Sequence, residues 1–109
     1  MNKVQIIGYL GSDPDVSYLP DGTCKAVVSL ATTEKWKGKD GKPDQERTDW
    51  HRVVFFGGQA ELAGKHLKKG SRCFVEGQLR TSKWLDNNGI DRYTTEIVVK
   101  GYAGILQFL

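Results

Sequence analysis

The sequence is poor in the residues that define several large classes of protein. It has only two cysteines, three prolines and one methionine among 109 residues. Its longest purely apolar run, Val53–Phe56, is far shorter than the roughly 20 residues that a membrane-spanning helix needs. Met1–Val4 has neither the apolar segment nor the small-residue cleavage site of a secretory signal. These absences exclude a membrane span and predict a cytoplasmic protein.

Nothing in the sequence predicts a cofactor or a catalytic centre. Cys24 and Cys73 lie far apart, which favours two reduced thiols. Zinc ligands could come only from these cysteines with His51 and His66, and no two of the four have the close spacing of a zinc site. Carboxylates such as Asp13 lie in turn sequences, where aspartate serves local hydrogen bonding. We therefore expect no metal, no cofactor and no enzymatic activity.

The length and the charge are those of a small, mildly basic domain. A chain of 109 residues suffices for one core, so we expect a single domain over residues 1–109. The 16 basic and 13 acidic residues give a net charge of +3, which permits nucleic acid as a partner without requiring it. Basic residues gather in two stretches, Lys35–Lys42 and Lys65–Arg72.

Strand-forming patterns dominate the chain, with one helical pattern among them. Residues 59–69 form the only good helix candidate, with Gly70 at the position after its C-cap. The charged segment 37–46 predicts a long hairpin loop or arm, and Asp86–Gly89 predicts a hairpin turn. The order is typical of an all-β protein with one helix, namely a five-stranded OB-fold barrel with a long hairpin arm, although other small mixed barrels also fit. The predicted strands are residues 3–10, 23–33, 47–56, 71–80 and 91–99.

The three tryptophans stand in unusual surroundings. Trp36, Trp50 and Trp84 each have a cation within two residues, whereas core tryptophans usually lie among aliphatic residues. Exposed aromatic rings stack on any nucleobase, and neighbouring cations neutralise phosphates. Together the three tryptophans favour a binder of single-stranded nucleic acid. The alternative is that they cap the ends of the barrel.

The segment around Trp50 is predicted to have two different faces. Because side chains alternate along a strand, Trp50, Arg52 and Phe56 share one face, and His51 points the other way. Phe56 is therefore a candidate to share a surface with Trp50. The alternative is that Phe55 and Phe56 are both buried. A single histidine such as His51 is more often a packed or interfacial residue than a catalyst.

At this level of detail the sequence resembles the bacterial-type single-stranded DNA-binding proteins. The matching motifs are collinear and span nearly the whole chain, and the segments WHRVV and EGQLRT are highly specific. The motifs are Asn2–Val4, Gly8–Pro14, Ser29–Thr33, Thr48–Gly57, Lys69–Ser71, Val75–Thr81, Lys83–Trp84 and Asp91–Glu96.

The resemblance implies a fold, a partner and a set of functional residues. It implies an OB fold, a homotetramer, and binding of single-stranded DNA with little sequence preference during replication, recombination and repair at the nucleoid. By position, the stacking residues are Trp36, Trp50, Phe56 and Trp84. The residues that meet phosphates are Lys39, Arg52, Lys69, Arg80 and Lys83. His51 matches a histidine at the subunit interface.

The sequence also departs from the family pattern. Gly58 stands where a lysine is common, and His66 replaces a frequent tyrosine. Arg72 and Cys73 differ from the common residues near the assembly surface. Full-length members continue into a flexible linker and an acidic tail that recruits replication and repair proteins. This chain stops at Leu109, so it is either a shortened or a naturally tail-less form, and we favour the first. We expect it to recruit those proteins only if such a tail follows.

Two further readings of the same surface stay open at this point. RNA is one, because stacking and phosphate contacts do not distinguish the sugars and no reader of the 2′-hydroxyl is evident. A protein-interaction module built on the same barrel is the other. The retention of all three tryptophans and Phe56 argues against the second, and the family resemblance favours DNA over RNA.

Overall fold

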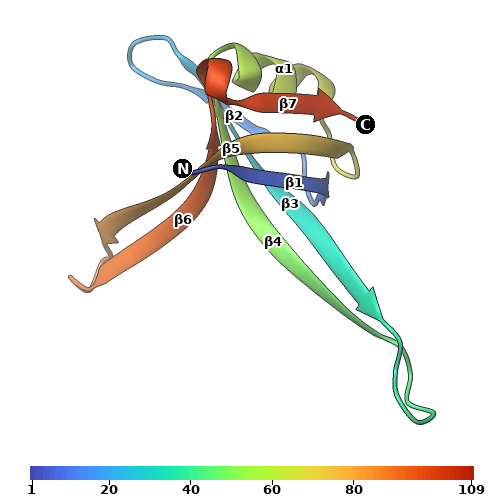
Figure 1. Cartoon of the computed structure of the whole chain (residues 1–109). Helices are drawn as coiled ribbons and strands as arrows, with labels where there is room; N and C mark the ends of the chain where they lie inside the picture. Colours follow the sequence, from blue (N-terminus) through green and yellow to red (C-terminus); the bar gives the residue numbers. More distant parts are fainter.

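Seven strands, one α-helix and one 3-10 turn follow one another in the computed structural model, which describes residues 1–109 (Figure 1). All five predicted strands and the predicted helix are present, and Asp15–Tyr18 and Ile105–Phe108 add two short strands. The elements are β1 (Val4–Leu10), β2 (Asp15–Tyr18), β3 (Cys24–Trp36), β4 (Gln45–Phe56), α1 (Gly58–His66), β5 (Arg72–Leu85), β6 (Asp91–Val99), η1 (Gly101–Ala103) and β7 (Ile105–Phe108).

Strand β1 closes the sheet into a barrel because it pairs with two strands at once. Residues 4–9 of β1 pair with β5, and residues 9–10 pair with β3. The sheet runs β1-β3-β4-β6-β5, so the β1–β5 pairing joins its two ends. This confirms the predicted five-stranded barrel of the OB fold. Strand β2 pairs with β3, and β7 pairs with β5, so the apolar C-terminal segment continues the sheet.

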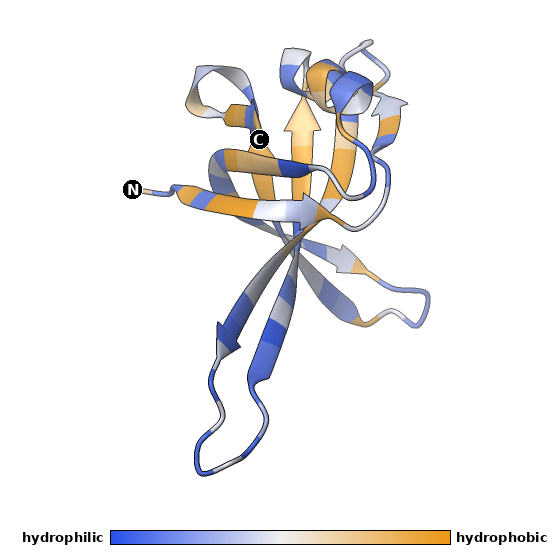
Figure 2. Cartoon of the chain, turned by 90° about the vertical axis from the view of Figure 1, so that its right-hand side faces the viewer, coloured by the Kyte–Doolittle hydropathy of each residue, from blue (hydrophilic) through white to orange (hydrophobic).

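The core lies inside the barrel beneath α1. Alternation directs Ala26, Val28 and Leu30 of β3 inward, where they meet Val53 and Phe55 of β4. Full burial of such a side chain contributes about 1.5–3 kcal/mol. Figure 2 shows the apolar residues concentrated in the barrel strands and on part of α1, while the segments that project from the barrel are mainly hydrophilic.

Two hairpin arms extend beyond the barrel (Figure 1). The β3–β4 arm stays paired out to Trp36 and Gln45, and the β5–β6 arm out to Leu85 and Asp91. The predicted strands 23–33 and 71–80 were therefore too short, and the predicted loop 37–46 too long. The reason is that polar residues pair across the two strands of each arm, such as Lys35 opposite Glu46. A strand of this kind has no alternating apolar pattern from which it could be predicted.

The helix ends earlier than its sequence pattern predicted. Helix α1 stops at His66, and Leu67 is its C-cap in extended conformation, so Gly70 does not follow the C-cap. Leu67 is buried in the core, which draws the chain out of the helix at that residue. Gly70 instead adopts a positive φ of 88° in the next turn, where its N–H donates to Leu10 O at 2.9 Å. No helix of the structure is long and apolar enough to cross a membrane.

Candidate nucleic-acid interface

The strand register gathers aromatic and basic residues on one outer face of the barrel. In β4, Val53 and Phe55 face the core, so the alternate residues face outward. Val54 pairs with Val98 of β6, and Glu96 of β6 pairs with Arg80 of β5. The outer face of β4-β6-β5 therefore carries the five predicted residues Trp50, Arg52, Phe56, Arg80 and Trp84. We call these five the outer row.

One residue of this face departs from simple alternation. Val54 lies on the outer side but is only 1% exposed, and Val98 beside it is only 4% exposed. Neither belongs to the cluster of core residues inside the barrel. The outer row therefore has a buried, apolar middle between Arg52 and Phe56.

Trp50 lies directly over a glycine. Its side chain is 60% exposed, and a Cβ atom placed on Gly11 would lie 2.5 Å from Cζ3 and 2.7 Å from Cη2 of the indole. The backbone N–H of Gly11 donates to Ser29 O at 3.1 Å, which holds the glycine against β3. The missing side chain at Gly11 thus sets where the ring of Trp50 lies. Sequence analysis did not assign this role to Gly11, since only the fold brings the two residues together.

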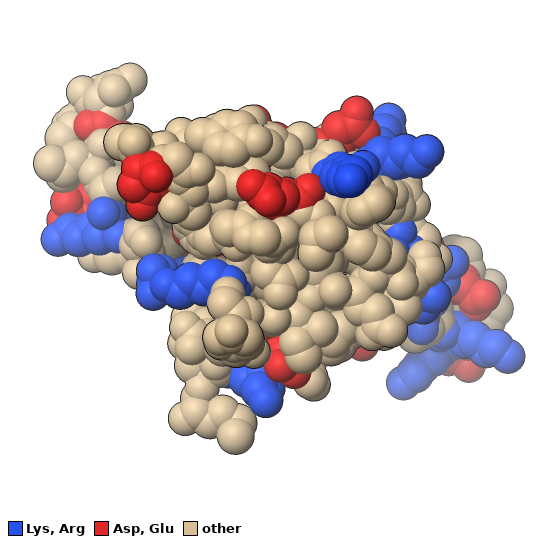
Figure 3. Space-filling model, turned by 90° about the horizontal axis from the view of Figure 1, so that it is seen from above, with Lys and Arg blue, Asp and Glu red and all other residues tan.

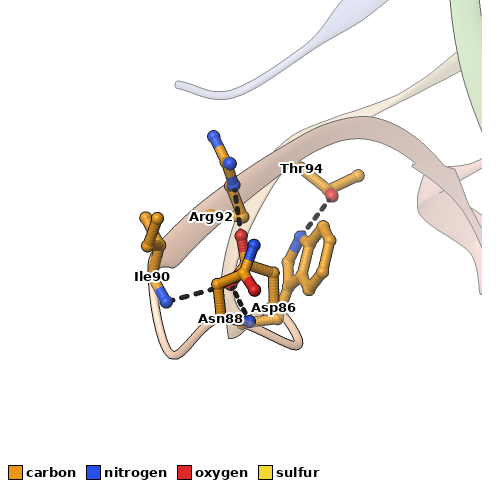
Figure 4. Close-up of polar contacts among 6 residues, drawn as sticks. Asp86, Asn88, Ile90, Arg92 and Thr94 are labelled. Carbon is orange, nitrogen blue, oxygen red and sulfur yellow. Dashed lines mark hydrogen bonds and ion pairs between the residues drawn. The ribbon is translucent and has the colours of Figure 1, made fainter.

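Trp84 is anchored by a hydrogen bond on the β5–β6 arm. Its indole Nε1 donates to Thr94 Oγ1 at 2.9 Å, and the side chain stays 49% exposed. The turn beyond it is tied together by Asp86, which accepts from the backbone N–H groups of Asn88 and Ile90 and from Arg92 Nε (Figure 4). The N–H of Ile90, and then Arg92, lower the pKa of Asp86 below its usual value. The ring therefore stands on a well-supported hairpin end.

Trp36 lies apart from the outer row, whereas Phe56 belongs to that row and also borders a hollow. Trp36 lies at the end of the β3–β4 arm opposite Gln45, and alternation places it on the same side of the ribbon as Leu30, away from the outer row. It is 46% exposed, since the arm projects clear of the barrel. Phe56 is half-buried and lines a separate hollow of about 790 Å³ with Leu62 and Tyr102.

The five predicted phosphate-binding cations differ in what surrounds them. Arg52 Nε donates to Glu96 Oε2 at 2.9 Å, and Lys83 Nζ lies 3.1 Å from Asp91 Oδ2. Such exposed pairs contribute only about 0–1 kcal/mol, so either cation can exchange its carboxylate for a phosphate. Ion pairs of this kind are absent for Lys39, Lys69 and Arg80, which are exposed.

Lys69 and Lys83 lie outside the outer row. Alternation directs Lys83 to the side of the β5–β6 arm opposite Trp84. Lys69 belongs to the turn after α1, and its backbone N–H donates to Asp13 Oδ1 at 2.8 Å. That bond joins the turn to the segment just after Gly11, so Lys69 is held near the Trp50 end of the row.

Seen from the α1 end of the barrel, charged residues are dispersed around a wide uncharged surface (Figure 3).

His51 faces away from Trp50, as alternation predicted. It is half-buried, and its Nε2 lies 2.8 Å from Thr32 Oγ1 of the neighbouring strand. His51 therefore has the surroundings of a packed or interfacial histidine.

The structure contains no group of three or more His, Cys, Asp or Glu residues that could hold a metal ion. Cys24 and Cys73 are both free and buried.

Comparison with known proteins matches the sequence and the fold to one family. The model of the single-strand binding protein family matches residues 1–108. The chain belongs to the single-strand binding protein family. Its sequence is 57% identical over 100 residues to single-stranded DNA-binding protein 1 of Xylella fastidiosa strain 9a5c, covering 92% of this chain and 74% of that protein. Family membership confirms the resemblance read from the motifs and the expectation of a non-enzymatic protein.

A solved structure of the same family matches the whole chain. The Plasmodium falciparum SSB in complex with ssDNA superposes with a TM-score of 0.89 at 40% sequence identity. The match covers 100% of this chain and 95% of that one. The barrel and both arms described above are therefore a fold that this family shares.

Proposed function

We propose that this protein binds single-stranded DNA with little sequence preference. The observation that carries the proposal is the outer row, in which three strands present aromatic rings and guanidinium groups on one face. Each ring that stacks on a base contributes about 1–3 kcal/mol without reading its identity. Each cation that meets a phosphate releases counterions. Bound in this way, the protein protects and organises single strands at the nucleoid during replication, recombination and repair.

The remaining predicted residues extend the contact along the arms and beside Trp50. Trp36 and Lys39 lie at the outer part of the β3–β4 arm, and Lys83 lies on the reverse side of the β5–β6 arm. A single strand is flexible enough to pass from the outer row around the edge of such a ribbon. Lys69, held near Gly11, meets a phosphate beside the base stacked on Trp50. The path therefore uses both faces of the arms.

We also propose that the protein assembles into a homotetramer. Residues 4–8 of β1 pair with β5 alone, so that edge of the strand is unpaired in one chain. An open strand edge is a template for pairing with another chain. Ile7 and Tyr9, which are 49% and 55% exposed, stand on the outer side of the same strand. We place His51 at a subunit interface of this assembly, in agreement with its half-buried state.

Titration of the intrinsic tryptophan fluorescence tests the proposal. We expect oligo(dT) to quench the emission strongly, and a duplex of equal length to quench it weakly. The affinity for oligo(dT) should fall with rising salt, with a slope of about 0.7 for each neutralised phosphate. Equal responses to the single strand and the duplex, or no quenching by either, would overturn the proposal. Oligo(U) in place of oligo(dT) tests the choice of DNA over RNA.

The contributions of single residues are tested against matched controls. Trp50→Ala and Trp36→Ala should lower the affinity for oligo(dT) with the fold intact. Tyr18→Ala is the control, because Tyr18 is a 67% exposed aromatic residue on β2, outside the outer row and both arms. Unchanged affinity in both tryptophan variants would remove stacking from the mechanism.

Sedimentation of the DNA-free protein measures its oligomeric state, and a monomer would contradict the proposed tetramer.

A further inference from the structure

The hollow beside Phe56 is built by parts of the chain that the family motifs do not connect. Its walls come from the end of β4, the first turns of α1 and the 3-10 turn η1, and it has a volume of about 790 Å³. The hollow is wide and open to solvent, which leaves room for a planar ring. Phe56, Leu62 and Tyr102 are the large apolar residues that line it. In Figure 1, η1 lies next to α1 at the same end of the barrel.

Tyr102 lies at the edge of this hollow, and its side chain does not pack against the core. Gly101 has a positive φ of 61°, and η1 (Gly101–Ala103) is followed by Gly104 in extended conformation, so Tyr102 lies at the centre of a single tight turn. The tyrosine is fully exposed, at 109% of its reference area. Gln59 of α1 donates from Nε2 to Gly104 O at 3.0 Å, which ties η1 to the helix. The tyrosine is therefore held beside the helix, with its ring in solvent and in contact with no core residue.

The space between the walls is open to a ligand. A Cβ atom placed on Gly57 or Gly58 would meet no heavy atom within 4 Å. The residues that line the hollow carry no charge, and one rim of it is Phe56, the last member of the outer row. An uncharged, partly aromatic hollow suits the face of a nucleobase, while the phosphate remains in solvent. The hollow thus continues the interface already described.

We propose that this hollow takes one further nucleobase of the bound strand, stacked between Phe56 and Tyr102, with Leu62 against its edge. The proposal rests on the proposed single-stranded DNA binding and extends its path past Phe56 to the α1 end of the barrel. Tyr102 then acts as an additional stacking residue. Its ring contacts a base only when DNA is bound, which accounts for a tyrosine held out of the core in a turn bordered by Gly101 and Gly104.

The test measures oligo(dT) binding by the full chain with Tyr102→Ala, Tyr102→Phe and Tyr18→Ala. We expect Tyr102→Ala to lower the affinity about fivefold, the low end of what one lost stacking contact costs. Tyr102→Phe keeps the ring and should bind as the unchanged protein does. Tyr18→Ala removes another exposed tyrosine, one that does not line the hollow, and should have no effect. Because Tyr102 packs against no core, its removal leaves the fold intact.

A local probe separates direct contact from other causes. In protein labelled with 3-fluorotyrosine, the ¹⁹F resonance that disappears in Tyr102→Phe belongs to Tyr102, and it should shift when oligo(dT) is added. If the unchanged protein binds oligo(dT) while Tyr102→Ala binds equally well and the resonance stays in place, this inference is wrong and the proposed function stands. If the unchanged protein does not bind, the proposed function itself fails. A change of oligomeric state in Tyr102→Ala would mean that a second copy covers the hollow, and would overturn the inference.

Discussion

Replacing Gly11 by alanine should move Trp50 without unfolding the protein. The new Cβ would lie 2.5 Å from Cζ3 of the indole, whereas carbon atoms in contact are about 3.5–4.0 Å apart. The ring must therefore move away by roughly 1–1.5 Å. The atoms that the methyl group meets are at the far end of an exposed side chain, so the barrel need not adjust. The hydrogen bond from the N–H of residue 11 to Ser29 O is kept.

The expected effect falls on binding rather than on stability. One stacked base contributes about 1–3 kcal/mol, so losing the stack on Trp50 lowers the affinity for oligo(dT) by a factor of about 5 to 150. A surface change that disturbs no core contact alters the free energy of unfolding by about 0.5 kcal/mol or less. We therefore expect a clear loss of affinity and of fluorescence quenching at an almost unchanged urea midpoint.

A double-mutant cycle with Trp50→Ala decides the cause. If Gly11→Ala acts through the indole, it should have no further effect once the indole is gone, so the double variant binds as Trp50→Ala does. Additive losses in the double variant would show that Gly11 matters for another reason. Full affinity in Gly11→Ala alone would show that the ring position seen here is not the one used for DNA.

Three further changes address the charges, the second tryptophan and the buried thiol. Glu96→Gln leaves Arg52 without the carboxylate 2.9 Å away, so oligo(dT) should bind more tightly at low salt, with a salt slope steeper by up to about 0.7; an unchanged slope would place Arg52 away from phosphate. Thr94→Val removes the acceptor of the Trp84 Nε1 bond, so the ring is held less firmly and oligo(dT) should bind less tightly, with a smaller loss than the roughly 5- to 150-fold expected for Trp84→Ala; an equal loss would mean that the anchor is as important as the ring. Burial raises the pKa of the Cys73 thiol from 9.0 to about 11, so the folded state holds this proton more tightly than the unfolded chain. Its contribution to stability is therefore complete below about pH 9 and is lost between pH 9 and 11, and the urea midpoint of the unchanged protein should fall more over that interval than that of Cys73→Ala; parallel curves would contradict this.

Local patterns predicted the order of the elements and the direction of several side chains. Inward- and outward-facing side chains alternate along the strand around Trp50. Trp50 was therefore expected on the outer face and His51 on the opposite face, and both are found there. The turn at Asp86–Gly89 could be predicted because its hydrogen bonds, to the backbone and to the side chain of Asp86, join residues two to four apart. Alternation and turn chemistry are local properties, and they survive in any fold that keeps the strands.

Features that depend on contacts between distant segments of the chain could not be predicted from local patterns. The arms are longer than predicted because paired polar residues hold them together, and helix α1 is shorter because Leu67 enters the core. Of the two alternatives for the phenylalanines, the structure contradicts burial of both and keeps Phe56 on the same face of β4 as Trp50. Phe55 is fully buried, whereas Phe56 is half-buried and borders a hollow whose other wall is Tyr102.

The sequence by itself determined that this is a small OB barrel of the single-strand binding family, with tryptophans set among cations. Those conclusions rest on composition, alternation and collinear motifs, which need no knowledge of distant contacts. Only the tertiary structure decided that Gly11 lies under Trp50, that Glu96 holds Arg52, and that Trp36 stands away from the outer row. Each of these depends on which strands pair and in what register. That register is a property of the paired strands of the whole sheet, and no short stretch of residues encodes it.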